Sequence, residues 1–246
     1  RETDRQQRDR LSVIGDLDSG FLERTGGDRQ VEAAIDNYEI AYRMQTAVPE
    51  LVDLAGETET TKKLYGLDSL NVSTAAYGRQ CLVARRLVER GVRFVELFHG
   101  DWDHHTNIYK RLPAECQATD QASAALVTDL ARRGLLDDTL VIWGGEFGRS
   151  LVAQKSQAPG EPVGRDHHVD AFTMWFAGGG VAAGRSIGET DDIGFDAVTD
   201  RWHIHDLHAT FLHALGMDHR RLTYQHQGRD YRLTDIHGTV KSELFA

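Results

Sequence analysis

The stretch that decides the predicted fold is Val92-Arg93-Phe94-Val95-Glu96-Leu97-Phe98, followed after two intervening residues by Asp101-Trp102-Asp103-His104-His105. The first run is rich in β-branched and aromatic residues, which favour a strand. Its mixed period is typical of a buried strand in a parallel sheet. The second run places carboxylates and two imidazoles beyond the carboxyl end of that strand. Open α/β sheets bind their ligands at this edge, so we expect the functional site there.

Helical and strand-like patterns alternate along the chain on either side of this stretch. Apolar residues recur at helical spacing in three segments, 75–90, 116–133 and 206–215. Short apolar strands are predicted at 92–98, 140–143 and 171–176. Helices and strands that alternate with short connections are the signature of βαβ units. We therefore predict an α/β fold, with a mainly parallel sheet flanked by helices and with these three strands as neighbours.

The segment 1–70 is predicted to be a helical part of the same domain that covers the sheet, and 71–246 is predicted to be the α/β core. Apolar residues at helical spacing run through 8–22 and 30–44, and Pro49 is expected to end the second helix. Within the core, 150–164 is predicted to be a mobile surface loop. The chain begins at Arg1 within a charged, helix-like run, so we expect a further segment upstream.

Composition excludes several classes of partner. The formal net charge is -10 with His neutral, which argues against nucleic acid, because phosphate binding depends on clustered Lys and Arg. No apolar run approaches the roughly 18 residues that indicate a membrane span. The two cysteines, Cys81 and Cys116, are too few for a disulfide framework and are predicted to be separate thiols.

Clusters of acidic residues and histidines at the predicted strand ends suggest a metal site. The candidate ligands are Asp103, His105, Glu146, His167 and His168. The carboxyl ends of parallel strands meet at one edge of a sheet, so we expect these side chains to share one or two coordination spheres. Carboxylate and imidazole ligands suit a divalent ion, with zinc as the first candidate and calcium or manganese as alternatives.

Three further residues have two readings each. Arg149 and Arg165 flank acidic clusters, where they would either bind an anionic substrate or neutralise the carboxylates. His205 stands at the start of the last predicted helix and is a further candidate for the site, although the Asp beside it is the usual type of helix cap. No catalytic nucleophile can be named, because Cys81 lies within a helix and Cys116 opens one away from the acidic clusters.

Six motifs stand out as a set, at 88–95, 134–141, 145–149, 164–168, 205–210 and 227–230. Together they resemble a bacterial family known only as domain of unknown function 1501, from about Val31 to the C-terminus. That family looks like a branch of the alkaline phosphatase and sulfatase superfamily. Its members often carry a twin-arginine export signal, which implies a periplasmic or envelope location.

The resemblance also implies roles for particular residues. Asp103 and His105 match the aspartate–histidine pair of one metal site with a shorter spacing, and His167 or His168 matches the later histidine of that site. Glu146 and Phe147 stand where the superfamily has the Asp-His of a second site, and Phe cannot bind an ion. The N-terminal strand that carries the nucleophile and the first metal-binding aspartate has no counterpart in this chain.

The expected function is therefore that of a metal-dependent, hydrolase-like protein acting on phosphate or sulfate esters and incomplete in this chain. Its substrate would be a small-molecule or glycan ester, and the metal would polarise the ester oxygens. The alternative is a non-catalytic, metal-stabilised envelope protein that binds a glycan or a protein partner. Phe147 favours that alternative, since it would mark chemistry that has been lost.

Overall fold

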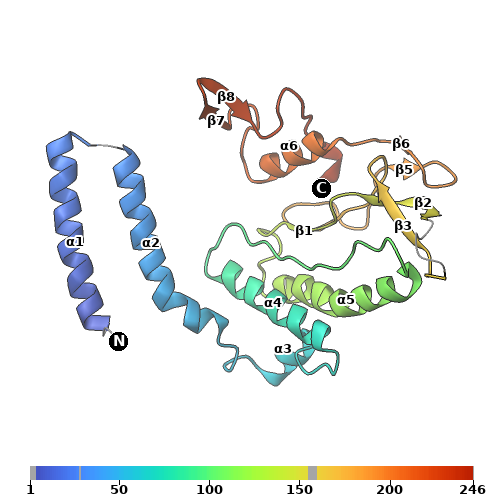
Figure 1. The fold of residues 1–246 in the computed structure, drawn as a ribbon, viewed down its shortest axis with the longest axis horizontal. Coiled ribbons are helices and arrows are strands. Elements are labelled where there is room, and N and C mark those ends of the chain that lie inside the picture. Colours follow the sequence, from blue (N-terminus) through green and yellow to red (C-terminus); the bar gives the residue numbers. More distant parts are fainter. Residues whose placement is uncertain (1–3, 28, 155–159, 246) are drawn as a thin grey trace. The chain divides into compact units, whose positions relative to one another are not determined.

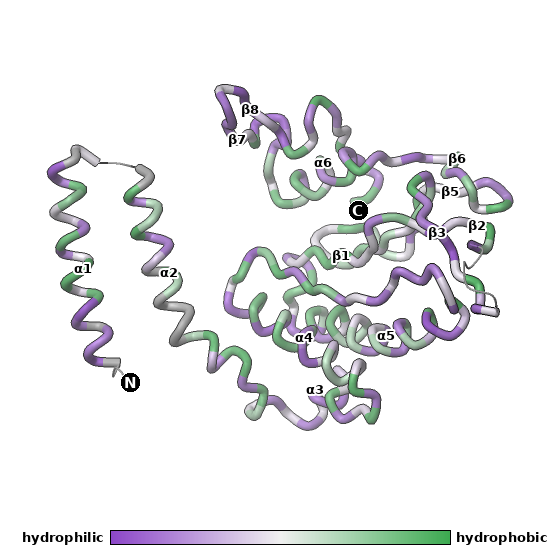
Figure 2. The backbone as a smooth tube through the Cα atoms, in the orientation of Figure 1, coloured by the Kyte–Doolittle hydropathy of each residue, from purple (hydrophilic) through white to green (hydrophobic). Residues whose placement is uncertain are grey.

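Two long helices, α1 (Asp4–Thr25) and α2 (Arg29–Val52), make up most of the first of two units, Arg1–Glu57 (Figure 1). The structure is a computed structural model that describes residues 4–27, 29–154 and 160–245. Hydrophilic and hydrophobic residues alternate along both helices (Figure 2), as the helical spacing predicts. The predicted end at Pro49 is wrong, because α2 continues to Val52. Proline removes one backbone donor, yet its own carbonyl still accepts from Asp53 N at 3.1 Å.

The second unit, Thr58–Ala246, begins with a helical layer. It contains α3 (Glu59–Leu64), α4 (Val72–Glu89) and α5 (Ile108–Arg132). Asn71 caps α4, its side chain accepting from Ser73 N at 3.0 Å, and Gly91 follows the helix with a φ of 79°. The helix predicted at 116–133 is present but starts earlier, with Pro113 inside it.

Helices α4 and α5 lie side by side and bury the main core of this unit (Figure 1). The predicted apolar stripe of α4 is buried at Cys81, Leu82 and Ala84. The facing residues of α5 are mostly small, namely Ala118, Ala122, Ala125 and Leu130, and each is 2% exposed or less. Small side chains let the two helices approach closely, so the contact is formed by well-packed but short side chains.

Gly78 on α4 is predicted to be a position where alanine is not tolerated. A Cβ there would overlap the carbonyl oxygen of Tyr65, a fully buried residue. We expect Gly78→Ala to lower the free energy of unfolding by about 1–3 kcal/mol, because overpacking outweighs the better helix propensity of alanine. Urea unfolding followed by tryptophan fluorescence measures this. Gly100→Ala, at an exposed position of the same unit where a Cβ meets nothing within 4 Å, is the control and should change the stability by less than about 0.5 kcal/mol.

The strands of the described residues form four two-stranded antiparallel pairs. Strand β1 (Val141–Trp143) pairs with β4 (Trp175–Ala177), and β2 (Gly148–Gln154) pairs with β3 (Gly164–His168). The shorter β5 (Glu189–Thr190) and β6 (Ala197–Thr199) form a third pair. The segment 150–154, predicted to be loop, belongs to β2; of the remaining predicted loop, 155–159 lie outside the described residues.

The predicted parallel sheet is wrong, and with it the α/β fold of the alkaline phosphatase and sulfatase type. Parallel neighbours need a crossover connection, usually a helix, but only the β2–β3 hairpin and loops join β1 to β4. The segment 92–98 has a bend at Arg93 and no regular secondary structure elsewhere, so it is not a strand. Phe94 is 71% and Phe98 78% exposed, so the apolar residues of this segment do not mark a buried strand. An extended segment becomes a strand only where a neighbour satisfies its backbone groups.

The C-terminal part contains α6 (Ile204–Ala214), the hairpin β7 (Thr223–His226) and β8 (Arg229–Arg232), and the short 3-10 helix η1 (Ser242–Leu244). Helix α6 was expected at 206–215. The hairpin has no counterpart in the sequence reading, although Gln227 and Gly228 at its turn both have positive φ, which favours two-residue hairpins. None of the described helices is long and apolar enough to span a membrane.

Candidate metal centre

Strand β3 docks on the segment that carries Asp103 and His105, and this contact builds the site. The backbone N–H of Arg165 donates to the carbonyl of His104 at 3.0 Å. The backbone N–H of Asn107 donates to the carbonyl of Pro162, also at 3.0 Å. A Cβ at Gly164 would overlap the backbone of His105. Glycine at this position therefore allows the two segments to touch and brings His167, three residues further along β3, towards Asp103.

Asp103, His105 and His167 form a cluster whose candidate ligand atoms all lie within 4.8 Å of one another. The Oδ1 atom of Asp103 lies 2.9 Å from Nε2 of His105 and 2.9 Å from Nε2 of His167. Zinc bonds of about 2.0–2.1 Å in tetrahedral geometry would place such donors roughly 3.3 Å apart. The two contacts with Asp103 therefore need to lengthen by only a few tenths of an ångström to hold an ion, and the two imidazole nitrogens lie within 4.8 Å of each other.

The hydrogen bonds of His105 fit a metal ligand. Its Nδ1 lies 2.6 Å from Oε1 of Gln154, while its Nε2 faces the Asp103 carboxylate. A neutral imidazole has one N–H and cannot donate to two oxygen acceptors. Either a ring that carries a proton on both nitrogens or a cation bound at Nε2 resolves this. With the cation, the ring keeps its proton on Nδ1 and donates it to Gln154. Ligating histidines usually have such a second partner, which fixes the orientation of the ring.

Arg149 supplies the positive charge that the cluster has in this structure. Its Nη1 lies 2.7 Å from Oδ1 of Asp103, and its Nη2 donates to the carbonyl of Trp102 at 3.4 Å. Hydrogen bonds from His167 and Arg149 lower the pKa of Asp103 to about 2. The carboxylate is therefore charged at any pH near neutrality, which is the form that binds a cation. Of the two readings of Arg149, the structure shows the one in which it neutralises a carboxylate.

The remaining predicted site residues are not brought into the cluster. Among the described contacts, Glu146 is linked to it through Arg149, whose Nη2 lies 4.0 Å from Oε1 of Glu146. His168 is buried, and its Nε2 points to the carbonyl of Phe195 at 2.5 Å, since successive strand residues face opposite sides. Arg165 contacts the site region through its backbone N–H. His205 lies at the start of α6, where its ring stacks on that of His237 with 5.4 Å between centroids.

Two residues near the cluster were not identified from the sequence. Gln154, the partner of His105, fell in the segment predicted to be loop. His104 is 1% exposed, and its burial lowers the pKa of the ring. Phe147 packs against His167 with 4.6 Å between ring centroids, so it contacts a candidate ligand without being one. A strand reading of 148–154 would have been the signal for Gln154.

The fold and the site together define a helical and β-hairpin protein with a solvent-accessible carboxylate–imidazole cluster. The chain belongs to the family described as "Protein of unknown function (DUF1501)", whose model matches residues 1–245. This confirms the family suggested by the motifs, while the match carries no link to the alkaline phosphatase and sulfatase superfamily. No curated protein matches the chain, and no solved structure matches it.

Proposed function

We propose that this chain is a divalent-metal-binding, hydrolase-like protein that binds phosphate or sulfate esters at the Asp103–His105–His167 cluster. The observation that carries the proposal is the convergence of one carboxylate and two imidazoles from two segments about 60 residues apart. Two histidines and a carboxylate form a common ligand set for zinc and other divalent ions, with open positions for water or substrate. A periplasmic or envelope location, implied by the family resemblance, belongs to the same proposal.

The surroundings of the cluster support an anionic ligand. The Asp103 side chain is 60% exposed and that of His167 is 42% exposed, so a bound ion would keep positions open to solvent. A metal ion there would act as a Lewis acid on an ester oxygen. Arg149 lies beside it with a planar guanidinium suited to phosphate and sulfate oxygens. Once a metal neutralises Asp103, Arg149 is released from that carboxylate for the anion.

The described contacts of the cluster lack a hydroxyl or thiol nucleophile. They are made by Arg149, Gln154, Asp166 and Phe147, none of which has a hydroxyl or thiol group. Cys81 is 1% exposed within α4, and burial raises the pKa of its thiol to about 12, so it is not a reactive thiolate. Binding of the ester is therefore the function that the geometry supports best. Hydrolysis by a metal-bound water is the second candidate, and the open face of the cluster favours it.

The test is phosphate binding and ester hydrolysis by the zinc-loaded chain. We expect inorganic phosphate to bind more tightly to the zinc-loaded chain than to the metal-free chain. At saturating zinc, Arg149→Gln should weaken phosphate binding by about tenfold or more, as the loss of a charged hydrogen bond does. Arg201→Gln, which replaces an exposed arginine, is the matched control. Isothermal titration calorimetry measures both affinities, and phosphate binding that ignores zinc would contradict the proposal.

Steady-state hydrolysis of an aryl phosphate and an aryl sulfate separates the two candidates. We expect the zinc-loaded chain to be no faster than its Asp103→Ala, His105→Ala double variant, because the described contacts of the site include no hydroxyl or thiol nucleophile for a covalent step. Turnover that disappears in the double variant would instead assign hydrolysis by metal-bound water to this centre.

A further inference from the structure

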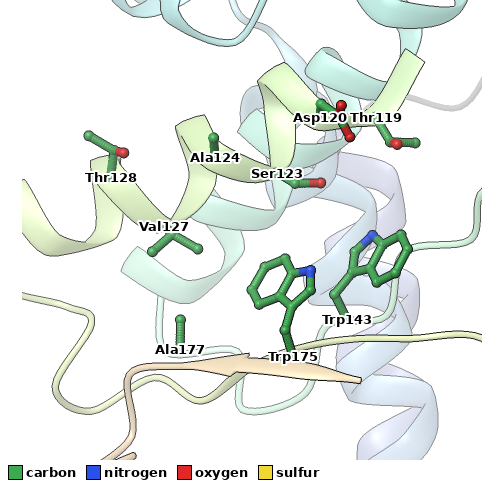
Figure 3. Close-up of a pocket in the computed structure, with 9 residues that line it drawn as sticks. All are labelled: Thr119, Asp120, Ser123, Ala124, Val127, Thr128, Trp143, Trp175 and Ala177. Atoms are coloured by element: carbon green, nitrogen blue, oxygen red, sulfur yellow. The ribbon is translucent and has the colours of Figure 1, made fainter. Parts of the chain in front are cut away.

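A second candidate site is a groove between α5 and the β1–β4 pair (Figure 3). Its volume is about 590 Å³, within the range of small-molecule sites. Helix α5 forms one wall with residues that include Asp120, Ala124 and Val127. The strands form the other wall with Trp143, Trp175 and Ala177. None of these residues belongs to the Asp103 cluster.

The two tryptophans give the groove an aromatic wall. Trp143 and Trp175 are directly opposite each other in the antiparallel register of β1 and β4, so their side chains share one face of the pair. Their rings are parallel to within 6°, with 6.3 Å between centroids, and Trp175 is 36% exposed. Figure 3 shows the two indoles side by side on the strand side of the groove, below α5. A group seated over their midpoint would contact both rings.

The charged residue of the groove favours a cationic ligand. Of the described residues that line it, Asp120 alone is charged, and its side chain is exposed. The hydroxyl of Thr119 donates to the carbonyl of Glu115 at 3.0 Å, and Ser123 Oγ is buried. Thr128 and the two indole N–H groups also line the groove and could bind the hydroxyls of a sugar, so the titration below compares the two ligand classes. One carboxylate beside two indole faces is suited to a cation with an apolar surface.

We propose that this groove binds a small quaternary or alkylated ammonium ion, with its cationic head over Trp143 and Trp175 and its charge balanced by Asp120. A cation about 4.5 Å above the midpoint of the tryptophan pair would lie within roughly 6 Å of both ring centroids, where the cation–π attraction acts, and tryptophan is the strongest aromatic partner. Ala124, Val127 and Ala177 provide apolar contacts for the alkyl groups. The net charge of -10 adds a long-range attraction for cations.

The groove is separate from the proposed metal centre in its chemistry and its residues. Trp102 lies between the two sites. Its ring packs edge-on against Trp143 with 5.9 Å between centroids, and the next residue in the chain is Asp103. The ammonium site requires no metal, however. Ammonium binding can therefore be tested on the metal-free chain. If the chain does not bind the ammonium ion, the proposed function of the metal centre is unaffected.

The experiment compares choline with 3,3-dimethylbutan-1-ol, the neutral compound of the same shape, by calorimetric titration of the full chain at constant ionic strength. We expect choline to bind in the millimolar range and the neutral compound to bind about tenfold more weakly, because only the cation gains the cation–π and carboxylate interactions. Asp120→Asn should weaken choline binding several-fold without changing the binding of the neutral compound. Trp175→Leu should weaken choline binding by about tenfold.

Two control variants keep the outcome interpretable. Asp192→Asn removes an exposed carboxylate outside the groove and should leave choline binding unchanged, so a general charge effect is excluded. Circular dichroism of each variant establishes that it is folded. If Trp175→Leu does not fold, Asp120→Asn, which changes an exposed side chain, still tests the site. Equal binding of the two compounds, or choline binding unaffected by Asp120→Asn, would overturn the proposal. Binding of methyl glucoside in preference to choline would overturn it in favour of a sugar.

Discussion

Replacing Asp103 and His105 together by alanine is expected to lower the affinity of the chain for Zn²⁺ by roughly a hundredfold or more. Loss of a residue that only orients a ligand typically costs about 10–100-fold in metal affinity, so loss of two direct ligands must cost at least as much. His167 alone would be left from the cluster. A single exposed imidazole does not hold a divalent ion against solvent.

The same centre predicts a graded series of variants. His167→Ala should also weaken zinc binding strongly, and Gln154→Ala should weaken it by about tenfold, because Gln154 accepts from Nδ1 of His105 at 2.6 Å. His226→Ala on β7 removes an exposed histidine outside the cluster and is the matched control. Competition with a chromophoric chelator measures the affinities. Zinc binding that survives in the double variant would show that the ion binds elsewhere.

The affinity should also fall as the pH is lowered. A metal ion competes with protons for the imidazoles, so binding releases protons and weakens in acid. Asp103 does not limit this competition, because its carboxyl, with a pKa of about 2, is already ionised. A calorimetric titration in buffers of different ionisation enthalpy would detect the released protons.

The sequence predicted the helices better than the strands, and it did not predict how the strands pair. The helical spacing on α4 and α5 was read correctly, because each helix buries one continuous apolar face. The run 92–98 has strand-forming residues, yet a strand depends on a partner elsewhere in the chain, and propensity does not reveal that partner. The direction of pairing between β1 and β4 followed from the connection between them, which has no helix.

For the candidate site, the residue types were more informative than the assumed sheet. Asp103, His105 and His167 come together although the parallel sheet that was expected to align them is not formed. The β2–β3 hairpin and the backbone contact at Gly164 align them instead. The sequence alone could not show which of His167 and His168 is the candidate ligand. Adjacent residues of a strand face opposite sides, so the choice between them requires the strand and its register to be known. The role of Gln154 depends on the same register.

Asp129→Ala is expected to lower the free energy of unfolding by about 3–5 kcal/mol, the usual cost of leaving a buried charge without its partner. The Asp129 carboxylate lies 3.1 Å from Nε of Arg85 and accepts from the Tyr65 hydroxyl at 3.0 Å. Arg85 is only 2% exposed and Tyr65 is fully buried, so water cannot replace the lost interactions. Burial and the neighbouring Asp129 also raise the pKa of Tyr65, which keeps its hydroxyl a donor.

Two further variants separate the loss of charge balance from the loss of packing. Tyr65→Phe removes one hydrogen bond to Asp129 and should cost only about 1 kcal/mol. The double variant Arg85→Met, Asp129→Ala removes both buried charges and should recover much of the stability, since replacing a buried ion pair by apolar groups is often neutral.

Urea unfolding followed by tryptophan fluorescence measures these changes for the second unit alone, because all four tryptophans, at 102, 143, 175 and 202, lie in Thr58–Ala246. If Asp129→Ala lowers the free energy of unfolding by less than about 1 kcal/mol, the ion pair contributes no more than an exposed one does. That result would mean that water reaches Arg85 and that the α4–α5 core is not sealed at this end. Glu89, at 2.5 Å from Nη1 of Arg85, is a further partner of the guanidinium. Because it still balances part of that charge in Asp129→Ala, the loss should fall in the lower part of the expected range.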